Sequence, residues 1–254
     1  MHWMPVFLFT TAFSFAAEIK PQTVAYRQDT AALEGIFISA PTQGKVPGVV
    51  LIHDWMGVSP QAQEYAKRVA AMGYAVFVAD IYGKNVRPKD ASEAGKVAGS
   101  FKANIPLLRQ RAAAALEAMK RQPGVDTTRM AVMGFCFGGG AALELARSGA
   151  VLKAAVSVHG NLNTPNPQDA RNIKGKVLVL HGAEDPFVSP EQVKNFMDEM
   201  RAAGTDWQLQ YFGGAVHGFT NPKAGSDPKQ GVAYNPNADR RAFESLKNFF
   251  MEAL

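Results

Sequence analysis

Five short runs of almost uniformly apolar residues alternate with segments of helical spacing, and this alternation constrains the fold more than any other feature of the sequence. A strand buried on both faces is a continuous apolar run, whereas a half-exposed strand alternates apolar with polar residues. Strands of the first kind alternating with helices predict an α/β fold, with a mostly parallel central sheet and helices on both faces. The runs are Gly48–Ile52, Ala75–Ala79, Met130–Met133, Ala154–Val158 and Val177–Leu180.

The remaining elements complete this pattern. Alternation over Thr23–Arg27 and Leu33–Ser39 predicts an opening antiparallel pair of strands. A last strand is predicted over Gln208–Phe212. Because ligands of such sheets bind beyond the carboxyl ends of the strands, functional residues are expected just after each strand. Helices are predicted over Ser59–Met72, Ser92–Phe101, Ile105–Arg121, Gly138–Arg147, Glu191–Ala203 and Ala238–Leu254.

Residues 1–16 are predicted to be a signal peptide. Met4–Phe15 is apolar and uncharged, and it is too short to span a bilayer comfortably but suits the core of an export signal. Small residues around Ala16 allow cleavage there. We therefore expect a single domain over residues 17–254, periplasmic or secreted, without stable membrane insertion after processing. An uncleaved apolar extension or membrane anchor, or a cytoplasmic location, is the alternative, because Lys and Arg are missing before Met4.

The charged and metal-binding residues exclude several classes of partner. The formal net charge is +5, but the basic residues occur as isolated pairs such as Lys67–Arg68, so no nucleic-acid partner is predicted. The single cysteine, Cys136, excludes an intramolecular disulfide and a cysteine-based zinc site. The five histidines lack helical metal-ligand spacing, so no metal is predicted. Nothing in the sequence sets an oligomeric state.

The segment Gly134-Phe135-Cys136-Phe137-Gly138 is the strongest functional signal. It matches the nucleophile-elbow pattern Gly-x-nucleophile-x-Gly and lies between an apolar strand and a helix, as that motif requires. The turn lifts Cys136 above the sheet and places it at a helix N-terminus, where the helix dipole favours a thiolate. A buried structural cysteine is the competing interpretation, because free cysteine is often buried. The strand–turn–helix context favours a nucleophile.

An elbow nucleophile needs an acid and a histidine, in that order along the chain. Asp185 and His217 each follow a predicted strand, so their side chains can meet Cys136 over one edge of the sheet. His217 would take the thiol proton and later protonate the leaving group, while Asp185 fixes the imidazole tautomer. Glu184 is the rival of Asp185 for the acid.

Two backbone N–H groups are predicted to form an oxyanion hole. One belongs to Phe137, the residue after the nucleophile. The other belongs to the loop of residues 53–57 that follows the first apolar run, where Trp55 is the predicted donor.

At these residues the sequence resembles the dienelactone hydrolase family. The likeness covers residues 30–254 and rests on the ordered segments HDWMGV, VADIYG, GFCFGG, HGAEDPFV and AVHGFTNP. It implies an α/β-hydrolase fold and hydrolysis of a small-molecule ester or lactone without a cofactor. It also implies a catalytic triad of Cys136, Asp185 and His217, with oxyanion donors at Phe137 and Trp55.

The sequence departs from this family in its expected substrate-binding residues. The best-known members have a glutamate near the cysteine and two arginines for a substrate carboxylate; the counterparts here are Asp54, Lys84 and Asn221. A lysine does not reproduce a bidentate arginine, which argues against dienelactone itself as the substrate. Tyr82 and Phe219 flank the same site and are expected to line an apolar pocket.

Three functions remain open from the residues. The first is ester or lactone hydrolysis through an acyl group on Cys136. The second is a noncatalytic small-molecule-binding protein on the same fold, and the third is a thioesterase or another acyl hydrolase. The filled triad positions and the intact elbow glycines favour the first.

Overall fold

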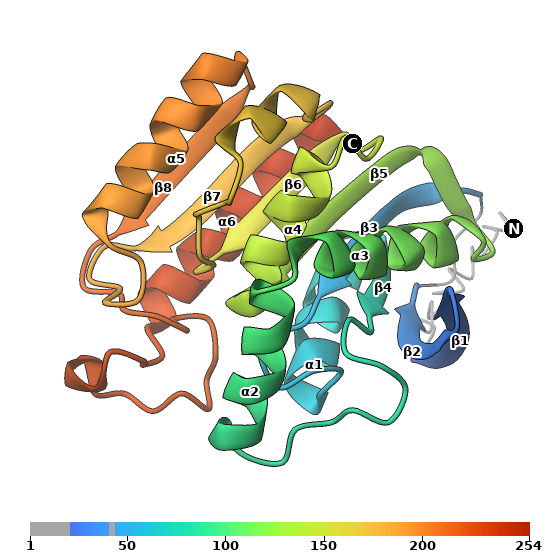
Figure 1. The fold of residues 1–254 in the computed structure, drawn as a ribbon, viewed down its shortest axis with the longest axis horizontal. Coiled ribbons are helices and arrows are strands. Elements are labelled where there is room, and N and C mark those ends of the chain that lie inside the picture. Colours follow the sequence, from blue (N-terminus) through green and yellow to red (C-terminus); the bar gives the residue numbers. More distant parts are fainter. Residues whose placement is uncertain (1–20, 41–43) are drawn as a thin grey trace, which may run out of the picture.

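The computed structural model describes residues 21–40 and 44–254, so the signal peptide predicted over residues 1–16 lies outside the described residues (Figure 1). Within the described part, the strands are β1 (Gln22–Gln28), β2 (Ala31–Ile38), β3 (Val46–Ile52), β4 (Ala75–Ala79), β5 (Val125–Phe135), β6 (Ala154–Val158), β7 (Lys176–Gly182) and β8 (Trp207–Phe212). The α-helices are α1 (Pro60–Ala70), α2 (Ala91–Lys102), α3 (Ile105–Lys120), α4 (Phe137–Arg147), α5 (Pro190–Ala203) and α6 (Pro236–Ala253). Two short 3₁₀ helices are η1 (Pro167–Asn172) and η2 (Pro228–Gln230).

All these strands form one sheet in the order β1-β2-β4-β3-β5-β6-β7-β8. The pairs β1–β2 and β2–β4 are antiparallel, and every pair from β4–β3 to β7–β8 is parallel. This confirms the predicted mostly parallel sheet with an antiparallel N-terminal part. Because β3 to β8 run in the same direction, their carboxyl ends meet at one edge, where ligands of such sheets bind.

Helices cover both faces of the sheet (Figure 1). In β3, Val49 and Leu51 belong to a core cluster with residues of α1 and α6. Val50 and Ile52 belong to the opposite cluster, with residues of α3 and α4. A third cluster joins α5 to β7. Burying one aliphatic side chain of this size stabilises the fold by roughly 1.5–3 kcal/mol, so the continuous apolar runs secure both layers of helices at once.

Side chains cap most of the helices at their N-termini. Ser59 accepts a hydrogen bond from the N–H of Ala62 at the start of α1, as its position before Pro60 predicts. Helix α4 is the exception, because its N-cap is Cys136 and no side chain caps it. Within residues 21–40 and 44–254, no helix has both the length and the apolar character to cross a membrane.

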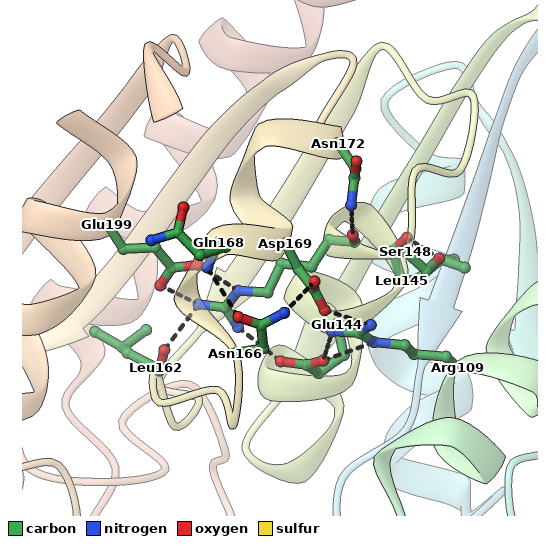
Figure 2. A network of polar contacts seen from close by, with 11 residues as sticks. Arg109, Glu144, Leu145, Ser148, Leu162, Asn166, Gln168, Asp169, Asn172 and Glu199 are labelled. Atoms are coloured by element: carbon green, nitrogen blue, oxygen red, sulfur yellow. Dashed lines mark hydrogen bonds and ion pairs between the residues drawn. The ribbon is translucent and has the colours of Figure 1, made fainter. Parts of the chain in front are cut away.

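A group of five charged side chains, here called the buried ion network, fastens α4 to its neighbours. Arg147 donates to both oxygens of Glu199 at 2.7 and 2.8 Å, and to Glu144 at 3.0 Å. Glu144 also accepts from Arg109 of α3 at 2.9 Å, and Arg109 in turn reaches Asp169 of η1 at 2.7 Å. Figure 2 shows how these side chains bridge helices that lie far apart in the sequence.

Candidate active site

Cys136 lies on a sharp turn between β5 and α4. Its backbone has φ 55° and ψ −118°, a conformation that side-chain-bearing residues rarely adopt. Two glycines make the turn possible, because a Cβ on Gly134 would lie 2.0 Å from the carbonyl oxygen of Gly138, and a Cβ on Gly138 would lie 2.2 Å from that of Ile52. The structure therefore places the predicted elbow as the sequence indicates, at the carboxyl end of a central strand.

The predicted partners of this cysteine lie beside it. His217 Nε2 is 3.1 Å from Cys136 Sγ, and His217 Nδ1 is 2.8 Å from Asp185 Oδ2. The other carboxylate oxygen of Asp185 accepts the N–H of Phe187 at 2.9 Å, which fixes the carboxylate plane. Glu184 is exposed, so Asp185 is the candidate acid that lies beside His217. Cys136, His217 and Asp185 are called the Cys–His–Asp trio below.

The surroundings of His217 favour its protonated form. Burial lowers the pKa of His217, but the hydrogen bonds to Asp185 and Cys136 and the negative charges of these two groups outweigh burial and raise it to about 10. A raised pKa keeps the proton on the imidazole, so His217 can serve as a proton donor beside Cys136.

A second histidine supports the elbow from below. The N–H of Cys136 lies 3.2 Å from His159 Nδ1 and 3.0 Å from the carbonyl oxygen of Val158. With Nδ1 accepting, Nε2 carries the hydrogen and donates to Thr220 Oγ1 at 2.9 Å. Burial, followed by the charge of His217, holds the pKa of His159 well below its usual range. His159 is therefore a neutral support for the turn.

The trio opens on a cavity of about 300 Å³. Cys136 and His217 lie in its wall together with apolar side chains from three loops, namely Trp55, Phe187, Val188 and Val232. Among residues 21–40 and 44–254, no group of three or more His, Cys, Asp or Glu side chains could hold a metal ion.

The sequence pattern of the dienelactone hydrolase family matches residues 33–254. The chain belongs to the dienelactone hydrolase family. It is therefore a member of a family of hydrolases, and its eight-stranded sheet has the α/β-hydrolase arrangement that solved dienelactone hydrolases share.

Several relatives from the dienelactone hydrolase family are similar over most of the chain. The solved structure called m3DLH superposes with a TM-score of 0.89 at 38% identity, covering 93% of this chain and 99% of that one. A dienelactone hydrolase-like promiscuous phosphotriesterase from metagenomic libraries gives 0.88 at 39% identity, covering 92% and 98%. A protein of Escherichia coli strain K12 with the proposed name carboxymethylenebutenolidase is 26% identical, covering 82% of this chain and 86% of its own.

The two predicted oxyanion donors flank the cysteine in this member of the dienelactone hydrolase family. Phe137 is the first residue of α4, where a backbone N–H has no partner within the helix. Trp55 is 39% exposed and lines the same cavity. Its loop is held by Tyr82, whose hydroxyl donates to the carbonyl oxygen of Trp55 at 3.1 Å. Tyr82 is thus buried behind the loop. Contrary to the prediction, it does not contact the cavity.

Two of the predicted substrate-binding residues contact other groups of the protein. Lys84 forms an ion pair with Glu34 at 3.2 Å, and its backbone N–H donates to the carbonyl oxygen of Ala32 in β2. Asp54 accepts the N–H of Met56 at 2.8 Å, and burial raises its pKa. Neither residue lines the cavity beside Cys136.

The prediction that Phe219 and Asn221 line the pocket is not met either. Phe219 is fully buried, with its ring 5.2 Å from that of His159 and 5.4 Å from that of Phe212, so it belongs to the core. The side chain of Asn221 accepts the N–H of Lys223 at 2.9 Å and closes a local turn. Closeness to His217 along the chain placed Phe219 near the site, and the family resemblance placed Asn221 there, but neither gives the direction of a side chain.

Lys102 and Asn161, which were not among the predicted site residues, also line the cavity. Lys102 ends α2, and Asn161 follows β6. Asn161 could have been predicted from the sequence, because it lies just beyond the carboxyl end of a parallel strand. Lys102 carried no such signal, since only the packing of α2 against the body of the protein brings it to the cavity.

Proposed function

We propose that this protein hydrolyses carboxylic esters or lactones through an acyl-enzyme on Cys136, without a cofactor. The observation that carries the proposal is the chain of contacts Cys136 Sγ to His217 Nε2 (3.1 Å) and His217 Nδ1 to Asp185 Oδ2 (2.8 Å), which ends at a cavity. Membership of a hydrolase family supports the same reaction class.

In the first half-reaction, the thiolate of Cys136 attacks the carbonyl carbon of the ester. The carbonyl oxygen becomes an oxyanion, which accepts hydrogen bonds from the N–H groups of Phe137 and Trp55. When the carbon–oxygen single bond breaks, the imidazolium of His217 gives its proton to the departing alkoxide. The alcohol leaves, and a thioester of Cys136 remains.

In the second half-reaction, neutral His217 removes a proton from a water molecule as that water attacks the thioester. Collapse of the second oxyanion expels the thiolate and releases the carboxylic acid. Asp185 keeps the proton of Nδ1 and holds the ring in the tautomer that both steps need. The raised pKa of His217 supports this cycle, because the thiolate–imidazolium pair is its starting state.

The test is hydrolysis of p-nitrophenyl acetate by the wild-type protein, Cys136→Ala and Cys136→Ser. Loss of the nucleophile is expected to lower kcat by on the order of 10⁶-fold, and Cys136→Ser should retain a small rate, because it keeps a poorer nucleophile on the same turn. Circular dichroism establishes that each variant is folded. Equal rates in all three proteins would remove Cys136 from the mechanism and leave a noncatalytic binding protein as the better interpretation.

A phosphotriester is the second candidate substrate, because a relative of 39% identity is named as a promiscuous phosphotriesterase. The same thiolate and the same N–H groups would act on a P=O group in place of C=O. Hydrolysis of a p-nitrophenyl dialkyl phosphate by the wild-type protein, abolished in Cys136→Ala, would support this activity. A stable phosphorylated cysteine without turnover would limit the protein to carboxylic esters.

A further inference from the structure

A second, larger cavity adjoins the one at Cys136. Its volume is about 630 Å³, and the smaller cavity measures about 300 Å³, so both are within the range of ligand pockets. Four residues line both cavities and mark the passage between them: Lys102, Phe137, Asn161 and Phe187. A molecule that reacts at Cys136 can therefore extend into the larger space.

The walls of the two cavities differ in chemistry. Aromatic and branched aliphatic side chains surround Cys136 in the smaller one. The larger one also has apolar side chains, among them Ile105, Leu108 and Phe187, but amide and hydroxyl side chains from the loop after β6 and from α5 join them, namely Asn163, Thr164 and Gln192 beside the shared Asn161. Uncharged hydrogen-bonding groups beside the exposed ring of Phe187 suit a neutral ligand that carries several hydroxyl groups.

The charged residues of the larger cavity do not favour binding of an ionic ligand. Glu144 reaches its wall, but its two oxygens already accept hydrogen bonds from Arg147 at 3.0 Å and from Arg109 at 2.9 Å. Figure 2 shows Glu144 facing Arg109 within the buried ion network. Lys102 is exposed at the rim, where water screens its charge.

Two side chains of this wall carry a buried oxygen that can accept a hydrogen bond from a ligand. Thr164 Oγ1 and Gln192 Oε1 are shielded from solvent and have no hydrogen-bond partner among the described residues. Rotation of either group into the cavity therefore breaks none of its hydrogen bonds. A buried oxygen without a partner is unfavourable, and a ligand hydroxyl would supply the missing donor.

We infer that the larger cavity binds the alcohol half of the substrate, and that this half is a neutral polyhydroxyl group such as a monosaccharide. The smaller apolar cavity then holds a short acyl chain against Cys136. This inference rests on the proposed ester hydrolysis and gives it a substrate class: a short-chain acyl ester of a sugar.

The experiment compares glucose 6-acetate with ethyl acetate, which share the acyl group and differ in the alcohol. The wild-type protein should hydrolyse the sugar ester with a kcat/KM at least about tenfold higher, the discrimination that roughly one or two additional neutral hydrogen bonds provide. Gln192→Leu and Thr164→Val should each reduce this ratio about three- to tenfold. Gln168→Leu is the matched control, because Gln168 is exposed on η1 and lines neither cavity.

A ratio near one in the wild-type protein, or an equal ratio in Gln192→Leu and Gln168→Leu, would overturn the inference while p-nitrophenyl acetate hydrolysis still supports the proposed function. Calorimetric titration of Cys136→Ala with glucose 6-acetate separates the two proposals from the other side. Binding that weakens in Cys136→Ala/Gln192→Leu supports the sugar site even if no ester is turned over. Absence of binding at millimolar ester contradicts the site.

Discussion

The Cys–His–Asp trio and the buried ion network both depend on α4, but they use their polar atoms differently. In the network at the C-terminal half of the helix, Arg147 donates to two carboxylates and to the carbonyl oxygen of Leu162. In the trio at the N-terminus, Cys136 Sγ has one protein partner and otherwise faces a cavity. The charged groups of the buried ion network are paired with one another and only hold the helices together. In the Cys–His–Asp trio, the sulfur atom faces the cavity and can react with a ligand.

Backbone strain separates the two regions as well. Cys136 has a positive φ of 55°, while Glu144 and Arg147 lie in regular helix. Strained residues persist where the surrounding structure over-determines them, and they gather at functional sites. The network supplies part of that surrounding structure, since it fixes α4 to α3, α5 and η1 (Figure 2).

Replacing Asp185 should have the largest effect, and it tests the role of the Cys–His–Asp trio in activity. Asp185→Asn is expected to lower kcat on p-nitrophenyl acetate by about 10⁴-fold, because the amide no longer selects the His217 tautomer that can exchange a proton with Cys136. The kcat is compared per folded molecule, because loss of the Asp185 charge also removes part of the stability that comes from protonated His217. Glu184→Gln is the control, and it should keep wild-type kcat. If the two variants were equally active, Asp185 would not be the orienting acid.

Breaking the buried ion network should lower stability and leave activity per folded molecule unchanged. Arg147→Met leaves Glu199 buried without its cation, removes one of the two cations of Glu144, and should reduce the free energy of unfolding by about 3–5 kcal/mol. Activity per folded molecule should persist below the unfolding transition. Arg201→Met, in an exposed pair with Asp198, should stay within about 1 kcal/mol of wild type. A small loss in Arg147→Met would show that the network contributes little to stability.

The trio should also give the stability a characteristic pH dependence. His217 titrates at about 10 in the folded protein and near 6.5 when unfolded, so its stabilising contribution is complete below pH 6.5 and declines as the pH rises toward 10. Urea unfolding of wild type and His217→Gln at pH 6, 8 and 10 should show their difference shrinking, at ~1.4 kcal/mol per pH unit at most. A difference that grows with pH would contradict the raised pKa.

The smallest effect concerns the strain at the elbow. Cys136→Gly and Cys136→Ala both remove the thiol, but only glycine adopts φ 55° and ψ −118° without steric conflict. Cys136→Gly should therefore be more stable than Cys136→Ala by about 1 kcal/mol, within the range of such strain. Thermal unfolding of the two inactive variants measures this difference. A more stable alanine variant would argue that the turn is relaxed in solution.

Much of the fold could be predicted from the sequence, because burial on both faces leaves an unmistakable apolar run. The predicted bounds of Ala75–Ala79 and Ala154–Val158 agree with β4 and β6. The beginning of β5 was missed, since Val125 to Arg129 is mostly polar and pairs with β3 across a register shift between Pro47 and Gly48. The short η1 and η2 were missed because they have no apolar periodicity.

The positions of the trio could be predicted for a related reason. Cys136 directly follows β5, and Asp185 and His217 lie in the loops after β7 and β8, so the common direction of these three parallel strands brings the side chains to one edge of the sheet. The cavity walls could not be predicted in this way. Lys102 and Gln192 come from helices, and their approach to the site depends on how α2 and α5 pack. Phe219 shows the converse, because proximity along the chain to His217 did not place its ring in the cavity.

The close approach of Gly134 and Gly138 also has an evolutionary consequence. Any side chain at either position would meet a backbone oxygen at 2.0 or 2.2 Å, so the frame of the turn tolerates no gradual change. The reactive atom itself has more freedom, because exchanging sulfur for oxygen at Cys136 leaves that frame intact. A lineage carrying this turn can therefore change its nucleophile in one mutational step, while the glycines on either side remain fixed across much longer divergence.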